Sequence, residues 1–175
     1  MRRLIGTLAL VALLAGGSCK TRKPRHEVLV DDSESTVSEI VRANDSRVAA
    51  QLARGFYELE SGAWRWTMPK FAIRFLLPDG VRGKGAVLKA DLVLPEVIFK
   101  TTGPIRLTAS AGNQSFGEQS LARVGDHTVS YTIPAAALTS ETITIEFRLD
   151  KALSPGAVDP RELGLIFIKA GLFKP

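Results

Sequence analysis

Two tryptophans, two positions apart, are the side chains of this sequence best suited to hold a ligand. On an extended strand Trp64 and Trp66 leave one face and Arg65 leaves the other. Two neighbouring indole rings offer a stacking platform for a sugar ring, beside a polar group that orients its hydroxyls. The same spacing fits two core side chains, since tryptophan is normally highly buried. Trp64, Arg65 and Trp66 are therefore candidate ligand-binding residues, with a core position for the tryptophans and a carboxylate partner for Arg65 as the alternative.

A charged stretch near the end of the chain, from Asp159 to Glu162, is a second candidate site. Its side chains could line a pocket at one end of the fold, or bind calcium together with Asp150. A calcium ion usually takes six to eight oxygen ligands, and this stretch lacks the dense Asp and Asn spacing of such sites. A pair between Arg161 and a carboxylate that holds the last loop explains the same residues. We favour this structural interpretation and predict no metal and no cofactor.

The sequence gives little support for catalysis. Its two histidines are His26, in a charged segment, and His127, at a turn that enters a strand. The motifs H-E-x-x-H and G-x-S-x-G, which mark common metal and nucleophile sites, do not occur. Glu58 and Glu60 form a carboxylate pair that would suit glycoside hydrolysis, but a solvated pair is the simpler interpretation. We predict that the chain is not an enzyme, and a small hydrolase with an unrecognised site is the remaining alternative.

The elements that would position these residues are short strands. Apolar and polar residues alternate over residues 87–94, 128–133 and 142–149, which is typical of antiparallel strands with one wet face. Further strands are predicted at residues 56–60, 64–67, 71–77, 105–111, 115–123 and 163–173, the last central and covered on both faces. Proline and glycine turns separate them. The pattern predicts an all-β fold, an antiparallel two-sheet β-sandwich of jelly-roll type.

The distribution of aromatic residues divides the chain. All twelve Phe, Trp and Tyr residues lie at or after Phe56, whereas residues 20–43 are rich in charge, Ser and Thr. Such a composition cannot bury enough apolar surface to offset chain entropy. We predict a signal peptide over residues 1–18, a flexible tether over 19–43, a short helix over 44–54 and a β-sandwich domain over 55–175. Asn44 is the expected N-cap of that helix and Gly55 its stop.

Two segments of the predicted domain resemble a protein module found in bacteria. The stretches GFYELESGAWRWTMPKFAIRF, over residues 55–75, and LDKALSPGAVDPRELGLIFIKAGL, over residues 149–172, resemble a bacterial β-sandwich module of unassigned function. That module is similar to galactose-binding-like domains, and it occurs in exported proteins and beside glycosyltransferases. The resemblance covers most of residues 55–172 and implies a sandwich fold. No functional residue is carried over from it.

The first nineteen residues have the three parts of a secretory signal. Two arginines precede an apolar run over residues 4–15, and Gly-Gly-Ser leads to Cys19, the only cysteine. Twelve residues rise about 18 Å as a helix, which is too short for a hydrocarbon core of roughly 30 Å. The segment resembles the lipobox of bacterial lipoproteins, whose cysteine receives the lipid, although Gly16 replaces the usual leucine. Ordinary cleavage before Ser18, releasing a soluble protein, and an uncut weak anchor are the alternatives.

The lipoprotein resemblance implies acylation of Cys19 and attachment to a membrane of the cell envelope. Lys20 follows the cysteine, and by the family's sorting rule a residue other than aspartate there directs the protein to the outer membrane in double-membraned bacteria. From Phe56 onward there are 14 Lys and Arg against 12 Asp and Glu, so no nucleic-acid partner is expected. We expect a lipid-anchored envelope protein with a non-catalytic β-sandwich that contacts glycan. The alternative is a structural or adaptor lipoprotein that docks another envelope protein and binds no sugar.

Overall fold

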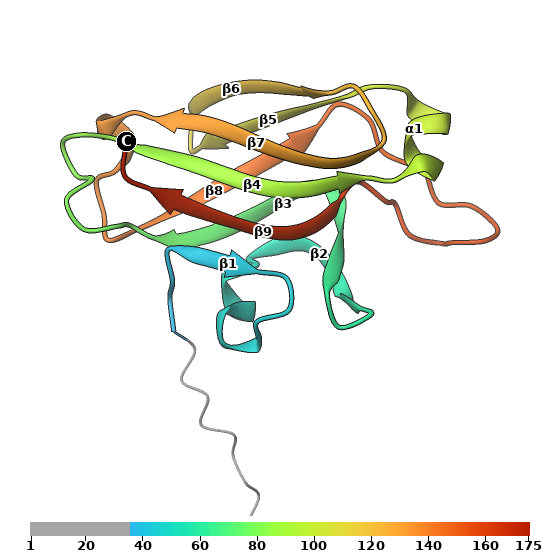
Figure 1. Cartoon of the computed structure of the whole chain (residues 1–175), viewed down its shortest axis with the longest axis horizontal. Helices are drawn as coiled ribbons and strands as arrows, with labels where there is room; N and C mark the ends of the chain where they lie inside the picture. Colours follow the sequence, from blue (N-terminus) through green and yellow to red (C-terminus); the bar gives the residue numbers. More distant parts are fainter. Residues whose placement is uncertain (1–35) are drawn as a thin grey trace, which may run out of the picture. The chain divides into compact units, whose positions relative to one another are not determined.

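The computed structural model describes residues 36–175, and nine β-strands dominate this part of the chain (Figure 1). The predicted signal peptide, Cys19 and most of the predicted tether lie outside the described residues. The strands are β1 (Ile40–Arg42), β2 (Arg54–Glu60), β3 (Trp64–Leu76), β4 (Ala86–Leu94), β5 (Ile105–Ala111), β6 (Gln114–Leu121), β7 (Gly125–Ile133), β8 (Thr142–Leu149) and β9 (Ile166–Phe173). The short helices are the 3₁₀ turns η1 (Ser46–Gln51) and η2 (Ala135–Ala137) and the α-helix α1 (Glu96–Thr102). No helix within residues 36–175 has the length and apolar character to cross a membrane.

The strands form two antiparallel layers that share β3. Hydrogen bonding follows the order β6-β5-β8-β3-β9-β4-β7, with β1 added to β9 and β2 added to β3. The first half of β3 pairs with β9, and the second half, from Lys70 to Leu76, pairs with β8. The layer of β1, β9, β4 and β7 therefore lies over the layer of β3, β8, β5 and β6 (Figure 1). The predicted all-β jelly-roll-type sandwich is confirmed.

The core lies between the layers, where the alternating strands point their apolar residues. Alternate residues of β4, from Ala86 to Leu94, are almost completely buried. The rings of Phe71 and Phe147 stack with centroids 4.8 Å apart in the layer that contains β8. Across the core, the hydroxyl of Tyr131 on β7 donates a 2.7 Å hydrogen bond to the carbonyl of Leu107 on β5. Burial raises the pKa of Tyr131, so this hydroxyl stays protonated and joins the two layers.

The prediction of a flexible tether is wrong for its last residues, because Ile40–Arg42 form β1, which pairs with β9. Val41 is completely buried, and its burial explains why a segment without aromatic residues joins the sheet. The side-chain amide of Gln51, in the segment after β1, links this segment to the chain before β1 and to β3. It accepts a hydrogen bond from the backbone amide of Ser38 and donates hydrogen bonds to the carbonyls of Ser38 and Arg74. The chain is thus attached to the sandwich well before the predicted domain boundary.

The predicted helix over 44–54 is shorter and differently capped. It is the 3₁₀ turn η1, and its N-cap is Asp45 rather than Asn44, because the Asp45 carboxylate accepts a hydrogen bond from the Arg47 amide. Gly55 does not stop this helix; it lies inside β2 with a φ of +77°. The strands predicted separately at 64–67 and 71–77 are one continuous strand, β3. The strand predicted over 163–173 begins at Ile166 and is central, between β3 and β4.

Candidate functional site

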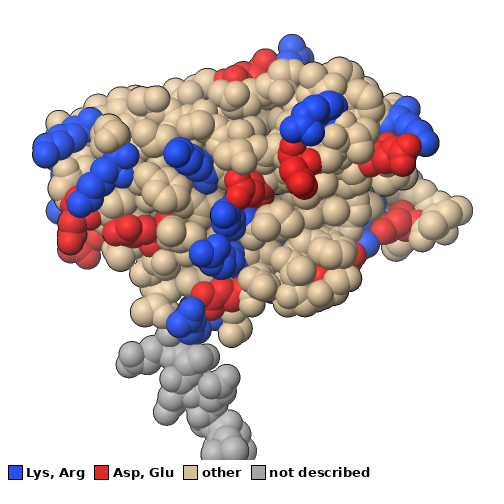
Figure 2. Space-filling model, viewed as in Figure 1, with Lys and Arg blue, Asp and Glu red and all other residues tan. Residues whose placement is uncertain are grey.

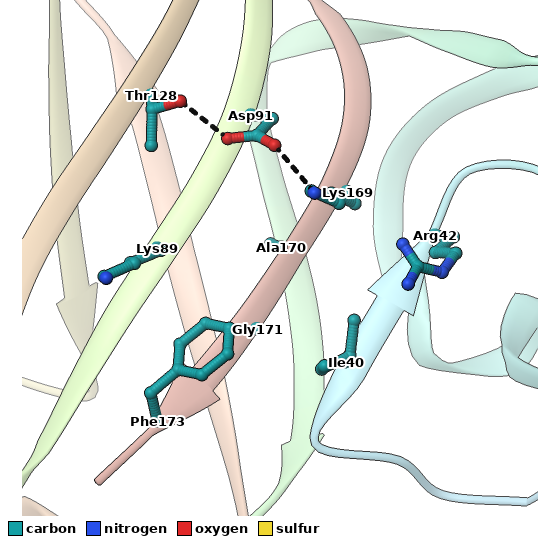
Figure 3. Close-up of a pocket in the computed structure, with 9 residues that line it drawn as sticks. All are labelled: Ile40, Arg42, Lys89, Asp91, Thr128, Lys169, Ala170, Gly171 and Phe173. Atoms are coloured by element: carbon teal, nitrogen blue, oxygen red, sulfur yellow. Dashed lines mark hydrogen bonds and ion pairs between the residues drawn. The ribbon is translucent and has the colours of Figure 1, made fainter.

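A shallow groove crosses the outer face of the layer formed by β1, β9, β4 and β7 (Figure 3). Its volume is about 280 Å³. The sheet register places its residues in two rows: Ile40, Gly171 and Lys89 in one, and Arg42, Lys169, Asp91 and Thr128 in the other. Figure 2 shows basic side chains following one another across β4, β9 and β1 on this face, with acidic groups between them. Four strands from distant parts of the sequence therefore build one charged surface.

Gly171 forms the floor of the groove because it places no side chain on the outer face. A Cβ built at this position would lie 3.1 Å from Cγ1 of Ile40 and 3.2 Å from Cε2 of Phe173. These two side chains therefore lean over the glycine from β1 and from the end of β9 (Figure 3). Phe173 is 39% exposed, and the ammonium of Lys89 lies over its ring, 5.6 Å from the centroid. The groove thus offers part of an aromatic ring beside a gap in the side-chain layer.

Asp91 is the acidic residue among those that line the groove, and its carboxylate is already engaged. Its Oδ1 accepts a 2.8 Å hydrogen bond from the Thr128 hydroxyl, and its Oδ2 lies 3.2 Å from the ammonium of Lys169. Both oxygens therefore have a partner, and the positive charge of Lys169 is balanced. The guanidinium of Arg42 forms no hydrogen bond or ion pair with any of the described residues.

The side chains that line this groove can hold a ligand by hydrogen bonding, charge and contact with an aromatic ring. The residues that line it include no histidine, no serine and no second carboxylate. His127 is next to Thr128 in the sequence, but its Nε2 lies 2.8 Å from the Arg123 carbonyl at the turn before β7. Within residues 36–175, no group of three His, Cys, Asp or Glu side chains is placed to hold a metal. Hydrogen bonding, charge and ring stacking remain as the means to hold a ligand.

The opposite layer carries a larger hollow, of about 570 Å³, over β3, β8 and β5. Its aromatic lining residues, Phe71 and Phe147, are each only 1% exposed and belong to the core. At its edge Arg54 and Glu146 form an ion pair. This hollow therefore presents no aromatic surface to a ligand, and the groove over Gly171 is the better candidate site.

The predicted ligand-binding residues lie away from the groove, at the start of β3. Trp64 and Trp66 are both half-buried, and Trp66 packs against the hydrophobic core. Arg65 donates 3.0 Å and 3.1 Å hydrogen bonds to the carbonyls of Ala43 and Tyr57, so it ties the N-terminal segment to β2 and β3. Its guanidinium also lies 3.9 Å from the Glu58 carboxylate, as the structural alternative expected. A ligand-binding role for the two tryptophans stays a prediction.

We expect the two tryptophans to differ in their contribution to stability. Trp66→Ala should lower the free energy of unfolding by about 3 kcal/mol, because it opens a cavity beside the core. Trp64→Phe should change it by less than about 1 kcal/mol, because the buried Nε1 of Trp64 has no hydrogen-bond partner in the described chain. Urea unfolding of both variants tests this difference. A loss in Trp64→Phe as large as that in Trp66→Ala would show that the indole of Trp64 is needed in the core.

The charged stretch before β9 forms a structural cluster around Arg161, and Asp150 is not part of it. The Arg161 guanidinium binds the Asp159 carboxylate at 2.8 Å and Glu60 of β2 at 2.7 Å, and it lies over the ring of Tyr57. Hydrogen bonding from Arg161 lowers the pKa of Asp159. Asp150 lies elsewhere, where its carboxylate accepts hydrogen bonds from the amide and guanidinium of Arg106. The favoured interpretation, an Arg161–carboxylate pair holding the last loop, matches this geometry.

The sequence reasoning missed the groove because its residues are spread from Ile40 to Phe173. One signal was present in β4, where Lys89 and Asp91 occupy the polar positions of an otherwise apolar strand. A second was Gly171, which places a residue without a side chain between Lys169 and Phe173 on a central strand. Neither signal identifies the partner strands, which only the register reveals.

Comparison with known proteins finds solved structures of low similarity to this chain. No protein-family model matches the chain, and no curated protein matches it in sequence. One similar solved structure is that of CBM51-2 in complex with GlcNAc and INT domains from Clostridium perfringens ZmpB, at 9% identity and a TM-score of 0.38. The match covers 79% of this chain and 28% of that chain. A second is a CBM4 structure, at 15% identity and a TM-score of 0.39, covering 81% of this chain and 91% of that one. Both are carbohydrate-binding modules with β-sandwich folds.

Proposed function

We propose that this chain is a lipid-anchored protein of a bacterial envelope whose β-sandwich binds a glycan in the groove over Gly171, without catalysing a reaction. The observation that carries the glycan proposal is the exposed ring of Phe173 beside a glycine floor, with hydrogen-bonding side chains around it. A sugar ring has an apolar face of C–H groups and a rim of hydroxyls. It therefore needs an aromatic surface and polar groups around it, and the groove supplies both.

The anchoring part of the proposal rests on the sequence. Cys19 follows a charged start, a short apolar run and small residues, and the thiol is the group that the lipoprotein resemblance assigns to acylation. One acyl chain holds a protein to a membrane only marginally, whereas two or three chains on one cysteine give a stable tether. The sandwich would then be held near the surface of the membrane that carries it.

Phe173→Ala tests the glycan proposal directly. We expect the intact, detergent-extracted protein to bind a subset of glycans on an array, and the variant to lose at least about tenfold in affinity because the stacking surface is gone. The free energy of unfolding should change by less than about 1 kcal/mol, since the ring is partly exposed at the end of a strand.

A matched control is Met68→Ala, since Met68 is an equally exposed apolar side chain, at 39%, that lies outside the groove. This variant should keep the affinity and the glycan preference of the unmodified protein. Glycan binding that survives Phe173→Ala unchanged would contradict the assignment of the groove. Capture of an envelope protein by a chain that binds no glycan would favour the adaptor alternative.

A further inference from the structure

We infer that the groove over Gly171 selects glycans that carry an anionic group, a carboxylate, sulfate or phosphate, over neutral glycans of the same ring structure. This inference rests on the proposed glycan binding and adds the chemical class of the ligand. Its first support is the count of charges: Arg42, Lys89 and Lys169 line the groove, against the single carboxylate of Asp91. The groove is therefore electropositive.

The second support is the state of the acidic group. Thr128 and Lys169 each contact one oxygen of Asp91 and use about half of the acceptor sites of this carboxylate, and the ammonium of Lys169 balances its charge. The lining cations that have no carboxylate partner among the described residues are Arg42 and Lys89. A guanidinium and an ammonium can only donate hydrogen bonds. The ligand must therefore supply acceptors, and an anion does so with hydrogen bonds roughly twice as strong as those of neutral groups.

The third support is that neither free cation is neutralised within the described chain. The charge of Arg42 acts on Asp45, but Arg47 already bonds both oxygens of that carboxylate. Lys89 has the Phe173 ring as its neighbour, at 5.6 Å, and no carboxylate. A ligand that brings a negative charge to this place gains attraction without breaking an ion pair.

The positions of the two cations suit a single sugar unit. Arg42 comes from β1 and Lys89 from β4, on the two sides of β9 (Figure 3). From the spacing of strands and residues, their Cα atoms are about 12 Å apart across the sheet. Gly171 lies between them and leaves the space open, and Phe173 borders the same gap. An anionic group can therefore sit over Gly171 within reach of both long side chains while its ring contacts Phe173.

The test compares ligands that differ only in charge. Oligogalacturonate and its fully methyl-esterified form share the ring and the other hydroxyls, and a sulfated and an unsulfated N-acetyllactosamine form a second pair. We expect the intact protein to bind at least one charged probe about tenfold or more tightly than its neutral counterpart at low salt. Raising the salt from about 50 to 500 mM should reduce this preference, because the exposed charges become screened.

Charge variants locate the effect. Arg42→Gln and Lys89→Gln should each weaken binding of the charged probe about threefold to tenfold, and should weaken binding of the neutral probe less. Lys84→Gln is the matched control, because Lys84 is an exposed basic residue in the loop before β4 and does not line the groove. It should change neither affinity. Asp91→Asn removes the one negative charge and should leave binding of the charged probe unweakened.

The outcomes separate the inference from the function on which it rests. Equal affinity for charged and neutral probes, with loss of both in Phe173→Ala, would overturn charge selection and leave the glycan proposal standing. Binding of none of the arrayed glycans would overturn both. Binding of inorganic sulfate as tight as that of the sulfated sugar, unaffected by Phe173→Ala, would show a site for free anions and would likewise overturn both.

Discussion

Gly55→Ala is expected to lower the free energy of unfolding by about 3 kcal/mol or more, because the added Cβ would have the shortest contact found for any glycine within residues 36–175. Gly55 lies in β2 with a φ of +77°, where an L side chain is strained. A Cβ at this position would lie 2.2 Å from the Lys70 carbonyl oxygen and 2.7 Å from Cα of Phe71. Both are backbone atoms of β3, so the two strands must separate to admit the methyl group.

Gly62→Ala is the matched control for this substitution. Gly62 has a similar φ of +63°, but no atom lies within 4 Å of the position of its Cβ. The control therefore keeps the backbone strain, about 1 kcal/mol, and lacks the steric clash. Chemical denaturation of the two variants measures the difference. Equal losses would show that backbone strain, and not the close approach of β2 and β3, makes glycine necessary at position 55.

Cys19→Ser is expected to remove the protein from the membrane fraction almost completely. The thiol is the proposed acyl acceptor, and a hydroxyl in its place does not receive the lipid. The preceding apolar run of twelve residues is too short to span a bilayer by itself. Fractionation and metabolic labelling with palmitate should show loss of label and a soluble protein or an unprocessed precursor.

Ser18→Ala serves as the control, since it changes the neighbouring residue and keeps the thiol. This variant should remain labelled and membrane-bound. A Cys19→Ser protein that stays in the membrane at its full mature size would reject lipidation. Release of both the unmodified and the Cys19→Ser protein as soluble chains beginning at Ser18 would favour ordinary cleavage.

Periodicity was sufficient to predict most strands of the sandwich, but it divided β3 into two. Pro69 interrupts the pattern there, and proline has no amide to donate to a sheet. The strand tolerates it because its pairing with β9 reaches Trp66 and its pairing with β8 begins at Lys70. Pro69 thus lies where β3 passes from one layer to the other. Nothing in the local sequence reveals a change of partner, since the partners on β9 and β8 are about 100 and about 70 residues away.

The candidate site was harder to predict than the fold for a related reason. Trp64 and Trp66 can be recognised as a pair from the sequence alone, because they lie two residues apart on one strand. The groove instead combines Ile40 with Lys89 and Phe173, and these residues become neighbours only through the antiparallel register of β1, β9 and β4. The β1 strand is three residues long and shows no alternation from which its pairing could be inferred.

The docking of β1 has a mechanical consequence. Ile40 and Arg42 form one wall of the groove, and they belong to the short strand through which the preceding chain enters the sandwich. Tension on that chain is therefore borne by the hydrogen bonds of Ser38 and then by those of β1, which also keep the wall in place. A ligand that contacts both β1 and β4 would hold β1 against the sheet. A ligand that binds the protein only while β1 is docked stabilises that docked form. Pulling on the chain and filling the groove thus oppose each other, so load weakens ligand binding and ligand resists detachment of the strand.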